Sequence, residues 1–181
     1  MAVLASQRLE LFAFTPTIVA AAIDGNATLA ATLALRVDDE WSNDDFREVL
    51  PLIASSVADD PGFADWTRLV VLSSSQMVIG AVGCLSYPDD DGVAEIGFGI
   101  SPSFEGHGYA TEAARELTKW VYRQHGVTEV IALCRVDNLA SAAVLRKLAR
   151  ETGTAITEEG RMLTWSLHDP NDGEIDGTTA S

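Results

Sequence analysis

The chain has 181 residues, a length that suits a single folded domain with a buried core. Its content of 47% hydrophobic and 22% charged residues is typical of a globular protein and excludes a disordered or fibrous chain. A net charge of −15 opposes nonspecific attraction to nucleic acid or to an acidic membrane. We therefore expect neither nucleic acid nor a membrane among its partners.

No stretch reaches the roughly 18 consecutive apolar residues that a membrane span needs, and residues 1–10 lack the pattern of a signal peptide. A cytoplasmic location is therefore expected. The two cysteines, Cys84 and Cys134, each lie inside an apolar run. This placement suits reduced core thiols better than a disulfide or a metal site, so we expect no bound metal.

The basic residues are concentrated in one part of the chain. Seven basic and three acidic residues lie between Arg115 and Arg150, which gives this segment a local charge of +4. Such a segment could hold an anionic cofactor, while the acidic remainder attracts a cationic second substrate. The charge distribution could equally serve solubility alone, and the sequence leaves both interpretations open.

The N-terminal third is expected to be mostly helical after a short strand at residues 8–14. Thr15 can cap the first helix, because its hydroxyl oxygen can accept from free backbone amides of the first turn. Asn26 is expected to cap a second helix in the same way. A third helix is expected to begin at Asn43 and to be interrupted at Pro51.

The remaining chain is predicted to contain strands and helices in a mixed order. The spacing of apolar residues in the last helix predicts an inner face of Ala140, Ala143, Val144 and Leu148. Residues 1–167 are expected to form one domain, and residues 168–181 a disordered polar tail. The predicted elements are strands Arg68–Leu72, Met77–Leu85 and Val93–Ile100, helix Tyr109–Gln124, strand Glu129–Arg135, helix Asn138–Leu148, and strands Ala155–Glu158 and Met162–Leu167.

The most informative segment runs from Glu95 to Ala113, where a strand passes through a glycine-containing turn into a helix. Gly106 and Gly108 allow the backbone to approach a ligand closely. The unpaired amides at the start of the helix, together with its dipole, favour an anion such as a pyrophosphate. Pro102 lacks a backbone donor and helps to end the pairing of the strand, which would leave a gap beside it.

Three short motifs in this region have a family resemblance. Ile100-Ser-Pro102, Gly106-His-Gly-Tyr-Ala-Thr-Glu-Ala113 and Asn138-Leu-Ala-Ser141 together resemble the GNAT acetyltransferase superfamily, in particular its RimJ/RimL-like branch of ribosomal-protein alanine acetyltransferases. The resemblance extends from about Leu9 to Leu167. It implies an α+β fold with a mixed, mainly antiparallel sheet that splays at the cofactor cleft and carries helices on both faces.

The resemblance also implies an enzyme that moves the acetyl group of acetyl-CoA, as cosubstrate, to a primary amine. The acceptor would be a small molecule or a peptide, and a homodimer is compatible with the family. The pantetheine would pair with the backbone of Phe98 and Ile100, and the pyrophosphate would lie on the turn. The implied cofactor-binding residues are Phe98, Ile100, Glu105, Gly106, His107, Gly108, Tyr109, Ala110, Thr111 and Asn138.

Acetylation of an amine requires a neutral nucleophile and benefits from a proton donor to the departing thiolate. Glu95 is the candidate base, because it lies on the strand that enters the cleft and partial desolvation would raise its proton affinity. Its alternative role is that of a solvent-facing strand residue. Ser141 is the candidate acid by the resemblance, and its alternative role is to close the cap of the helix that Asn138 begins.

Three departures from the family pattern bear on the chemistry, and a fourth, Ala149-Arg150 in place of the usual Gly-Phe, affects local packing. Glu105 stands where relatives usually have Gln or Arg, and its carboxylate would repel a pyrophosphate. Leu145 replaces a Tyr proposed as general acid in many relatives, and Leu133 replaces a Glu that serves some of them as base. These departures leave open a noncatalytic acyl-CoA-binding or protein-interaction module as the alternative function.

Overall fold

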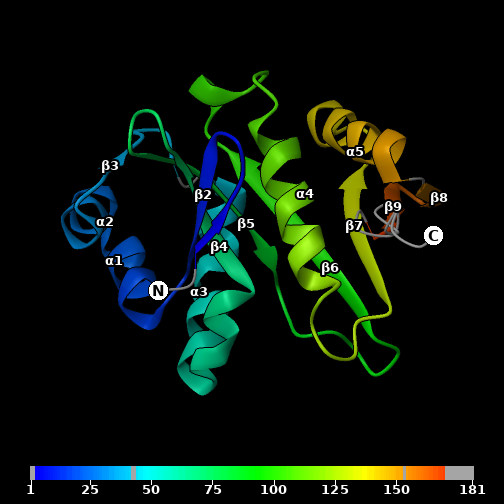
Figure 1. Cartoon of the computed structure of the whole chain (residues 1–181), viewed down its shortest axis with the longest axis horizontal. Coiled ribbons are helices and arrows are strands. Elements are labelled where there is room, and N and C mark those ends of the chain that lie inside the picture. Colours follow the sequence, from blue (N-terminus) through cyan, green and yellow to red (C-terminus); the bar gives the residue numbers. More distant parts are fainter. Residues whose placement is uncertain (1–2, 42–43, 153, 170–181) are drawn as a thin grey trace, which may run out of the picture.

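A computed structural model describes residues 3–41, 44–152 and 154–169, and its centre is one large twisted sheet (Figure 1). The strands follow the order β1-β2-β4-β5-β6-β7-β9-β8, with the short β3 paired beside β5. Only the β3–β5 and β6–β7 pairs are parallel among the described strands. The strands are β1 (Val3–Ala5), β2 (Leu9–Ala13), β3 (Arg36–Val37), β4 (Thr67–Leu72), β5 (Met77–Cys84), β6 (Val93–Ile100), β7 (Glu129–Arg135), β8 (Thr154–Glu159) and β9 (Met162–Leu167).

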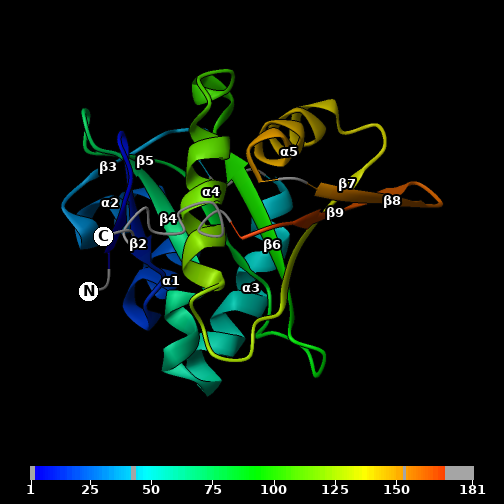
Figure 2. The same ribbon diagram turned by 45° about the vertical axis from the view of Figure 1, so that its right-hand side comes forward.

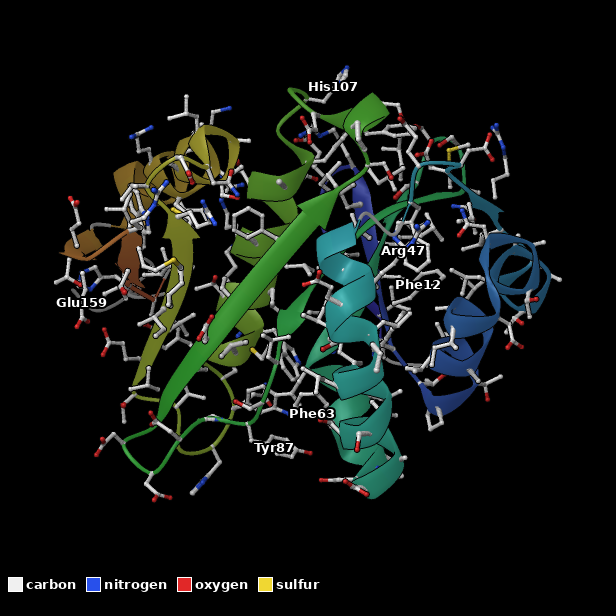
Figure 3. All side chains as sticks on the ribbon, turned by 180° about the vertical axis from the view of Figure 1, so that it is seen from behind. Phe12, Arg47, Phe63, Tyr87, His107 and Glu159 are labelled. Carbon is white, nitrogen blue, oxygen red and sulfur yellow. The ribbon has the colours of Figure 1, made fainter. Side chains whose placement is uncertain are left out.

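Helices cover both faces of this sheet (Figures 1 and 3). Helix α4 packs along β6 on one face and also contacts β2 and β5. Helices α1 and α3 pack together on the opposite face, where Figure 3 shows α3 in front of the sheet. The predicted α+β architecture is therefore confirmed. The helices are α1 (Pro16–Asp24), α2 (Asn26–Leu33), α3 (Asp44–Asp59), α4 (Tyr109–Val121) and α5 (Leu139–Thr152), with short 3-10 turns η1 (Pro61–Asp65) and η2 (Pro102–Phe104).

The sheet splays between β6 and β7, as the turned view of Figure 2 shows. These strands pair in parallel only where Val93–Glu95 lies beside Glu129–Ile131. Beyond that point β6 stays paired with β5 as far as Ile100, while β7 turns away and pairs with β9 as far as Arg135. Beyond this point no strand of the described ranges lies beside the edge of β6 that faces β7, and the predicted splay is confirmed.

The N-terminal helices agree with the sequence in part. The Thr15 hydroxyl accepts from the Ile18 amide, so its predicted capping role is confirmed. The Asn26 prediction is wrong: Asn26 is already inside α2, and its side-chain amide donates to the Asp38 carbonyl. The predicted start at Asn43 lies outside the described residues.

Helix α3 continues through Pro51, so the predicted interruption is also wrong. A proline inside a helix removes one backbone hydrogen bond and usually bends or breaks the helix. Leu50, Ile53 and Val57 lie on both sides of Pro51 and are all buried in the core. Their burial holds the helix against the sheet and offsets the missing bond.

The inner face of α5 differs from the predicted one. Ala142, Leu145 and Leu148 are buried, whereas Ala140 and Ala143 are exposed. Alanines occur on several sides of this helix, so the pattern of hydrophobic residues gave little contrast between its faces. The helix also extends to Thr152, four residues past the predicted end.

Cys84 and Cys134 are both free and buried, as the apolar runs around them predicted. Burial, with a smaller contribution from the negative charge of Glu95, raises the pKa of the Cys84 thiol to about 12. None of the helices in the described ranges is both long and apolar enough to cross a bilayer.

Candidate active site

A cleft of about 450 Å³ opens where β6 and β7 part. One wall is the end of β6 with the turn that follows it, and the other wall is the first half of α5. Two parts of the chain far apart in sequence therefore meet across a gap in the sheet. The lining consists of Phe98, Gly99, Ile100, Phe104, Glu105, Gly106, Gly108, Tyr109, Ala110, Thr111, Asn138, Ala140, Ser141, Ala143, Val144 and Lys147.

The turn between η2 and α4 exposes backbone amides to this cleft. Gly106 and Gly108 have φ angles of 76° and 81°, in the left-handed region that favours glycine. A Cβ added at Gly106 would meet no atom within 4 Å, so the protein itself leaves this space open. Gly108 is the N-cap of α4 and offers no side chain to the first turn, which leaves the amides that begin at Tyr109 for an anion.

Thr111 gives an independent sign that a polar ligand belongs here. Its side-chain hydroxyl is buried in the cleft lining and finds no hydrogen-bond partner among the described residues. Buried polar groups are rarely left in this state, because an unmade hydrogen bond costs about 1 to 3 kcal/mol. A phosphate oxygen over the start of α4 would supply the missing acceptor, so this end of the cleft fits a pyrophosphate.

The structure brings together all but one of the predicted cofactor-binding residues. His107 is the exception, since it does not line the cleft and instead lies at the outer tip of the turn (Figure 3). Its ring is stacked on that of Tyr109, with the ring centroids 5.6 Å apart, and its Nδ1 lies 2.8 Å from the Glu105 carbonyl oxygen. The His107 side chain thus stabilises the turn from outside.

Sequence reasoning missed two cationic side chains at the site, Lys147 and Arg8. Lys147 lies on α5 and lines the cleft from the side opposite the turn. The basic segment that contains Lys147 indicated that a cation could lie at the cofactor site. Nothing in the sequence distinguished Lys147 from the other basic residues of that segment. Its ammonium supplies positive charge on the same cleft that contains the unfavourable Glu105 carboxylate.

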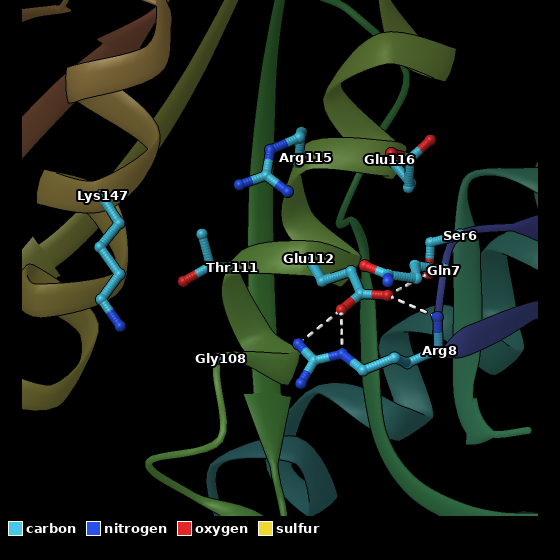
Figure 4. A pocket seen from close by; sticks show the side chains of 9 residues that line it. All are labelled: Ser6, Gln7, Arg8, Gly108, Thr111, Glu112, Arg115, Glu116 and Lys147. Carbon is cyan, nitrogen blue, oxygen red and sulfur yellow. Dashed lines mark hydrogen bonds and ion pairs between the residues drawn. The ribbon is translucent and has the colours of Figure 1, made fainter. Parts of the chain in front are cut away.

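Arg8 and Glu112 lie in an adjoining pocket of about 510 Å³, which also reaches Thr111 and Lys147 (Figure 4). The Glu112 carboxylate accepts from the Ser6 hydroxyl, from the Arg8 amide and from the Arg8 guanidinium. Burial acts to raise the pKa of Glu112, but these donors together with the positive charge outweigh it and lower the pKa overall. The N-terminal segment is thereby fixed to the first turn of α4.

Comparisons with known proteins agree with this geometry. The sequence model of the acetyltransferase (GNAT) domain matches residues 8–149. The chain belongs to the GNAT acetyltransferase family. It is 31% identical to the uncharacterized N-acetyltransferase YjdG of Bacillus subtilis over 151 residues, which are 82% of this chain and 89% of that protein.

Solved structures share the fold at lower sequence identity. A RimL ribosomal L7/L12 alpha-N-protein acetyltransferase in complex with coenzyme A has a TM-score of 0.63 and 19% identity, covering 93% of this chain and 99% of that one. An acetyltransferase from Agrobacterium tumefaciens has a TM-score of 0.62 and 19% identity, and the match covers 93% of this chain and 95% of the Agrobacterium chain. The GNAT fold therefore covers almost the whole described chain.

The two candidate catalytic residues of this GNAT protein lie in different places. Ser141 lines the cofactor cleft, where its backbone amide donates to the Asn138 side-chain oxygen at 3.0 Å. The backbone N–H of Asn138 donates to the Arg135 carbonyl oxygen. This N–H therefore does not donate to the Ser141 hydroxyl, as it would in a capping box. Glu95 does not line this cleft, and its side chain is exposed to solvent on β6, beside the point where the sheet splays. The expected partial desolvation of Glu95 is therefore wrong, because β6 presents this side chain to solvent.

Leu133 and Leu145, the two leucines at positions where the family resemblance led us to expect a proton-transferring side chain, have different surroundings. Leu145 is fully buried and forms part of the core beneath α5. Leu133 lies on β7 and is 37% exposed. Neither side chain can transfer a proton, so proton transfer in this protein must use other groups.

Proposed function

We propose that acetyl-CoA binds in the cleft between β6, the α4 turn and α5, and that its acetyl group passes to a primary amine at the inner end of the cleft. The observation that carries the assignment is the buried Thr111 hydroxyl, which has no partner among the described residues and lies beside a turn of two left-handed glycines. This combination suits an anionic, extended ligand. The splayed edge of β6 offers free backbone to its uncharged arm.

Each part of the ligand has suitable residues in this cleft. The backbone of Phe98 and Ile100 would hold the pantetheine, since the edge of β6 facing β7 is unpaired there. The amides from Gly106 to Thr111 would hold the pyrophosphate, with the Lys147 ammonium adding positive charge. The Asn138 side chain would contact the ligand near its thiol.

When bound, acetyl-CoA supplies an activated thioester carbonyl. The amine nitrogen attacks this carbonyl carbon, so that a C–N bond forms and the C–S bond breaks. Glu95, whose exposed carboxylate lies beside the splay, takes the proton that the ammonium must lose before attack, directly or through one water. The nitrogen gives up its second proton to solvent after the attack. The Ser141 hydroxyl is positioned in the cleft to give a proton to the departing sulfur and to regain one from solvent. The products are the amide, free coenzyme A and one released proton.

Calorimetric titration of acetyl-CoA and of free coenzyme A tests the site directly. We expect saturable one-to-one binding to the wild type and none to Gly108→Trp, because the indole would fill the turn. Gly160→Trp is the matched control, since Gly160 is also a left-handed glycine in an open turn but lies between β8 and β9. Absence of binding to the wild type, or equal binding to Gly108→Trp, would contradict the assignment.

Release of free thiol from acetyl-CoA in the presence of amines then tests the role of Glu95. The Glu95→Gln variant should keep its affinity for acetyl-CoA and lose about 100-fold or more in turnover, the usual contribution of a general base. Glu159→Gln, a similar change at an exposed residue at the end of β8, should behave as wild type. Unchanged turnover in Glu95→Gln would remove Glu95 from the reaction.

We further propose a cytoplasmic location, which the two free, buried cysteines support because secreted proteins tend to pair theirs. A homodimer is compatible with the family, and light scattering of the pure protein would measure the oligomeric state.

A further inference from the structure

A second, apolar pocket lies on the other side of β6, against α3. It encloses about 170 Å³. Its walls come from one side of α3 and from the facing strands β5 and β6, and almost all of its lining is hydrophobic or glycine. The lining residues are Phe46, Val49, Ile53, Thr67, Ala81, Val82, Gly83, Cys84, Leu85, Gly97, Phe98 and Gly99.

This pocket owes its space to small residues on one face of the sheet. Gly97 is paired with Gly83 across β5 and β6, and Gly99 is paired with Ala81. A Cβ added at Gly97 would meet no atom within 4 Å, so the position faces open space. A larger residue at Gly97 would extend into this space and leave no room for a ligand, whereas a Cβ at Gly83 would meet the backbone of Thr67.

The pocket borders the proposed cofactor cleft, because Phe98 and Gly99 of β6 line both. A group seated against α3 therefore lies across a single strand from the ligand that occupies the splayed edge. Glu95 is two residues before Gly97 and lies on the same face of β6, because side chains alternate along a strand. Its charge also acts on Cys84, a lining residue. One carboxylate thus stands beside an otherwise apolar pocket.

A small recess of about 20 Å³ adjoins this pocket. It shares Phe46, Ala81 and Gly99 with the apolar pocket and is also lined by Ser101. Ser101 is only 3% exposed, and its hydroxyl has no hydrogen-bond partner among the described residues. Because buried hydroxyls are rarely left unpaired, the missing partner is either one water, which a recess of this size holds, or a polar group of a molecule in the adjoining pocket.

We infer that the acceptor is an arylalkylamine, a primary amine that carries one aromatic ring on a short chain. The inference rests on the proposed function and names its substrate class. The volume is close to that of a cavity of about 150 Å³ that binds benzene, so one ring fits and a second does not. The apolar lining takes the ring, while Glu95 and the strongly negative protein attract the ammonium.

Phenethylamine is the probe that separates this inference from the proposed function. Calorimetry on the full chain saturated with free coenzyme A measures binding of the amine without turnover. We expect phenethylamine to bind saturably, and spermidine and an alanine-starting peptide to bind at least about tenfold more weakly, since neither buries a ring. Thiol release from acetyl-CoA should follow the same order.

Gly97→Leu fills the pocket and should raise the Kd for phenethylamine by at least about tenfold, with Gly97→Ala giving a smaller rise. Both variants should bind acetyl-CoA within about twofold of wild type, which also shows that they fold. Thr157→Leu on β8 adds the same bulk away from the pocket and should change neither affinity.

The outcomes separate the two claims. Turnover of spermidine or the peptide in preference to phenethylamine, or an unchanged Kd for phenethylamine in Gly97→Leu, would overturn the inference while the acetyltransferase assignment stands. Phenethylamine binding that Gly97→Leu abolishes, without acetyl transfer to any amine, would support the pocket and contradict the proposed reaction.

Discussion

The Arg8 Nε donates a hydrogen bond to the Glu112 Oε2 at 2.7 Å, although the two residues are 104 positions apart in the chain. The same guanidinium donates from Nη1 to the His107 carbonyl oxygen and lies over the Tyr109 ring, 4.6 Å from its centroid. Arg8 therefore joins the N-terminal segment, the glycine turn and the first turn of α4. The shape of the proposed pyrophosphate site depends on a residue outside the turn itself.

The first prediction follows from this contact. Glu112 accepts hydrogen bonds from three donors, and Glu112→Gln removes the negative charge that strengthens them. The free energy of unfolding should therefore fall by about 1 to 2 kcal/mol at pH 7. This range is kept small because Arg8 is partly exposed, so that solvent screens its charge. Urea unfolding followed by tryptophan fluorescence measures the change. Glu116→Gln is the control, since Glu116 makes a single ion pair with Lys119 one turn along α4 and its loss should cost less than about 0.5 kcal/mol.

The contribution of Glu112 should also depend on pH. Its pKa in the folded protein lies below the ordinary value of 4.5, so the folded state binds this proton less readily than the unfolded state. The stabilisation is therefore fully present above about pH 4.5 and is lost as the pH falls through the lowered pKa. The difference between wild type and Glu112→Gln should shrink in acid. A constant difference between pH 7 and pH 3 would contradict this account.

Thr111 gives a prediction in which stability and binding change differently. Thr111→Val keeps the shape of the side chain and removes a hydroxyl that has no partner among the described residues. The free protein should be as stable as wild type or more stable, while the Kd for acetyl-CoA should rise about tenfold, the value of one hydrogen bond to a charged group. Calorimetry and urea unfolding on the same samples test both. A loss of stability with unchanged affinity would assign the hydroxyl to the fold alone.

Glu105 should weaken binding of the cofactor through charge repulsion. Glu105→Gln removes one negative charge from the cleft lining, and we expect the Kd for acetyl-CoA to fall about three- to tenfold at low salt. The gain should shrink as salt is added, because the side chain is exposed and its charge is screened. Glu159→Gln changes the net charge equally and should have no effect. An improvement that salt does not reduce would point to a cause other than charge.

The region from Glu95 to Ala113 was predictable because its structure is determined locally. A proline after the strand and two glycines before the helix specify the turn with little help from the rest of the chain. The bounds of β6 and β7 matched their predicted ranges for a related reason, since both follow the buried and exposed alternation of strands.

Features that depend on distant contacts were not predictable in this way. The pairing of Arg8 with Glu112 joins segments that only the folded sheet brings together. The apolar pocket forms because Gly83 and Gly97 meet across two strands beneath α3, and neither glycine alone signals a cavity. The face of α5 was mispredicted because alanines on several sides of the helix weaken the pattern.

Ser141 provides the last prediction, which separates its two possible roles. The cap of α5 is made by the Asn138 side chain, which accepts from the Ser141 backbone amide, and Ser141→Ala preserves that bond. The free energy of unfolding should therefore change by less than about 0.5 kcal/mol. Turnover should fall about 10- to 100-fold with the affinity for acetyl-CoA unchanged, because a proton donor acts only on the departing sulfur.

Two further variants complete this test. Ser141→Thr keeps a hydroxyl and should recover part of the turnover. Asn138→Ala removes the side chain that caps α5 and should lower the free energy of unfolding by about 1 kcal/mol. This value is the reference for the loss of a helix cap. If Ser141→Ala showed that same loss of stability while turnover stayed at the wild-type level, the hydroxyl would belong to the helix and the sulfur would have to take its proton from solvent.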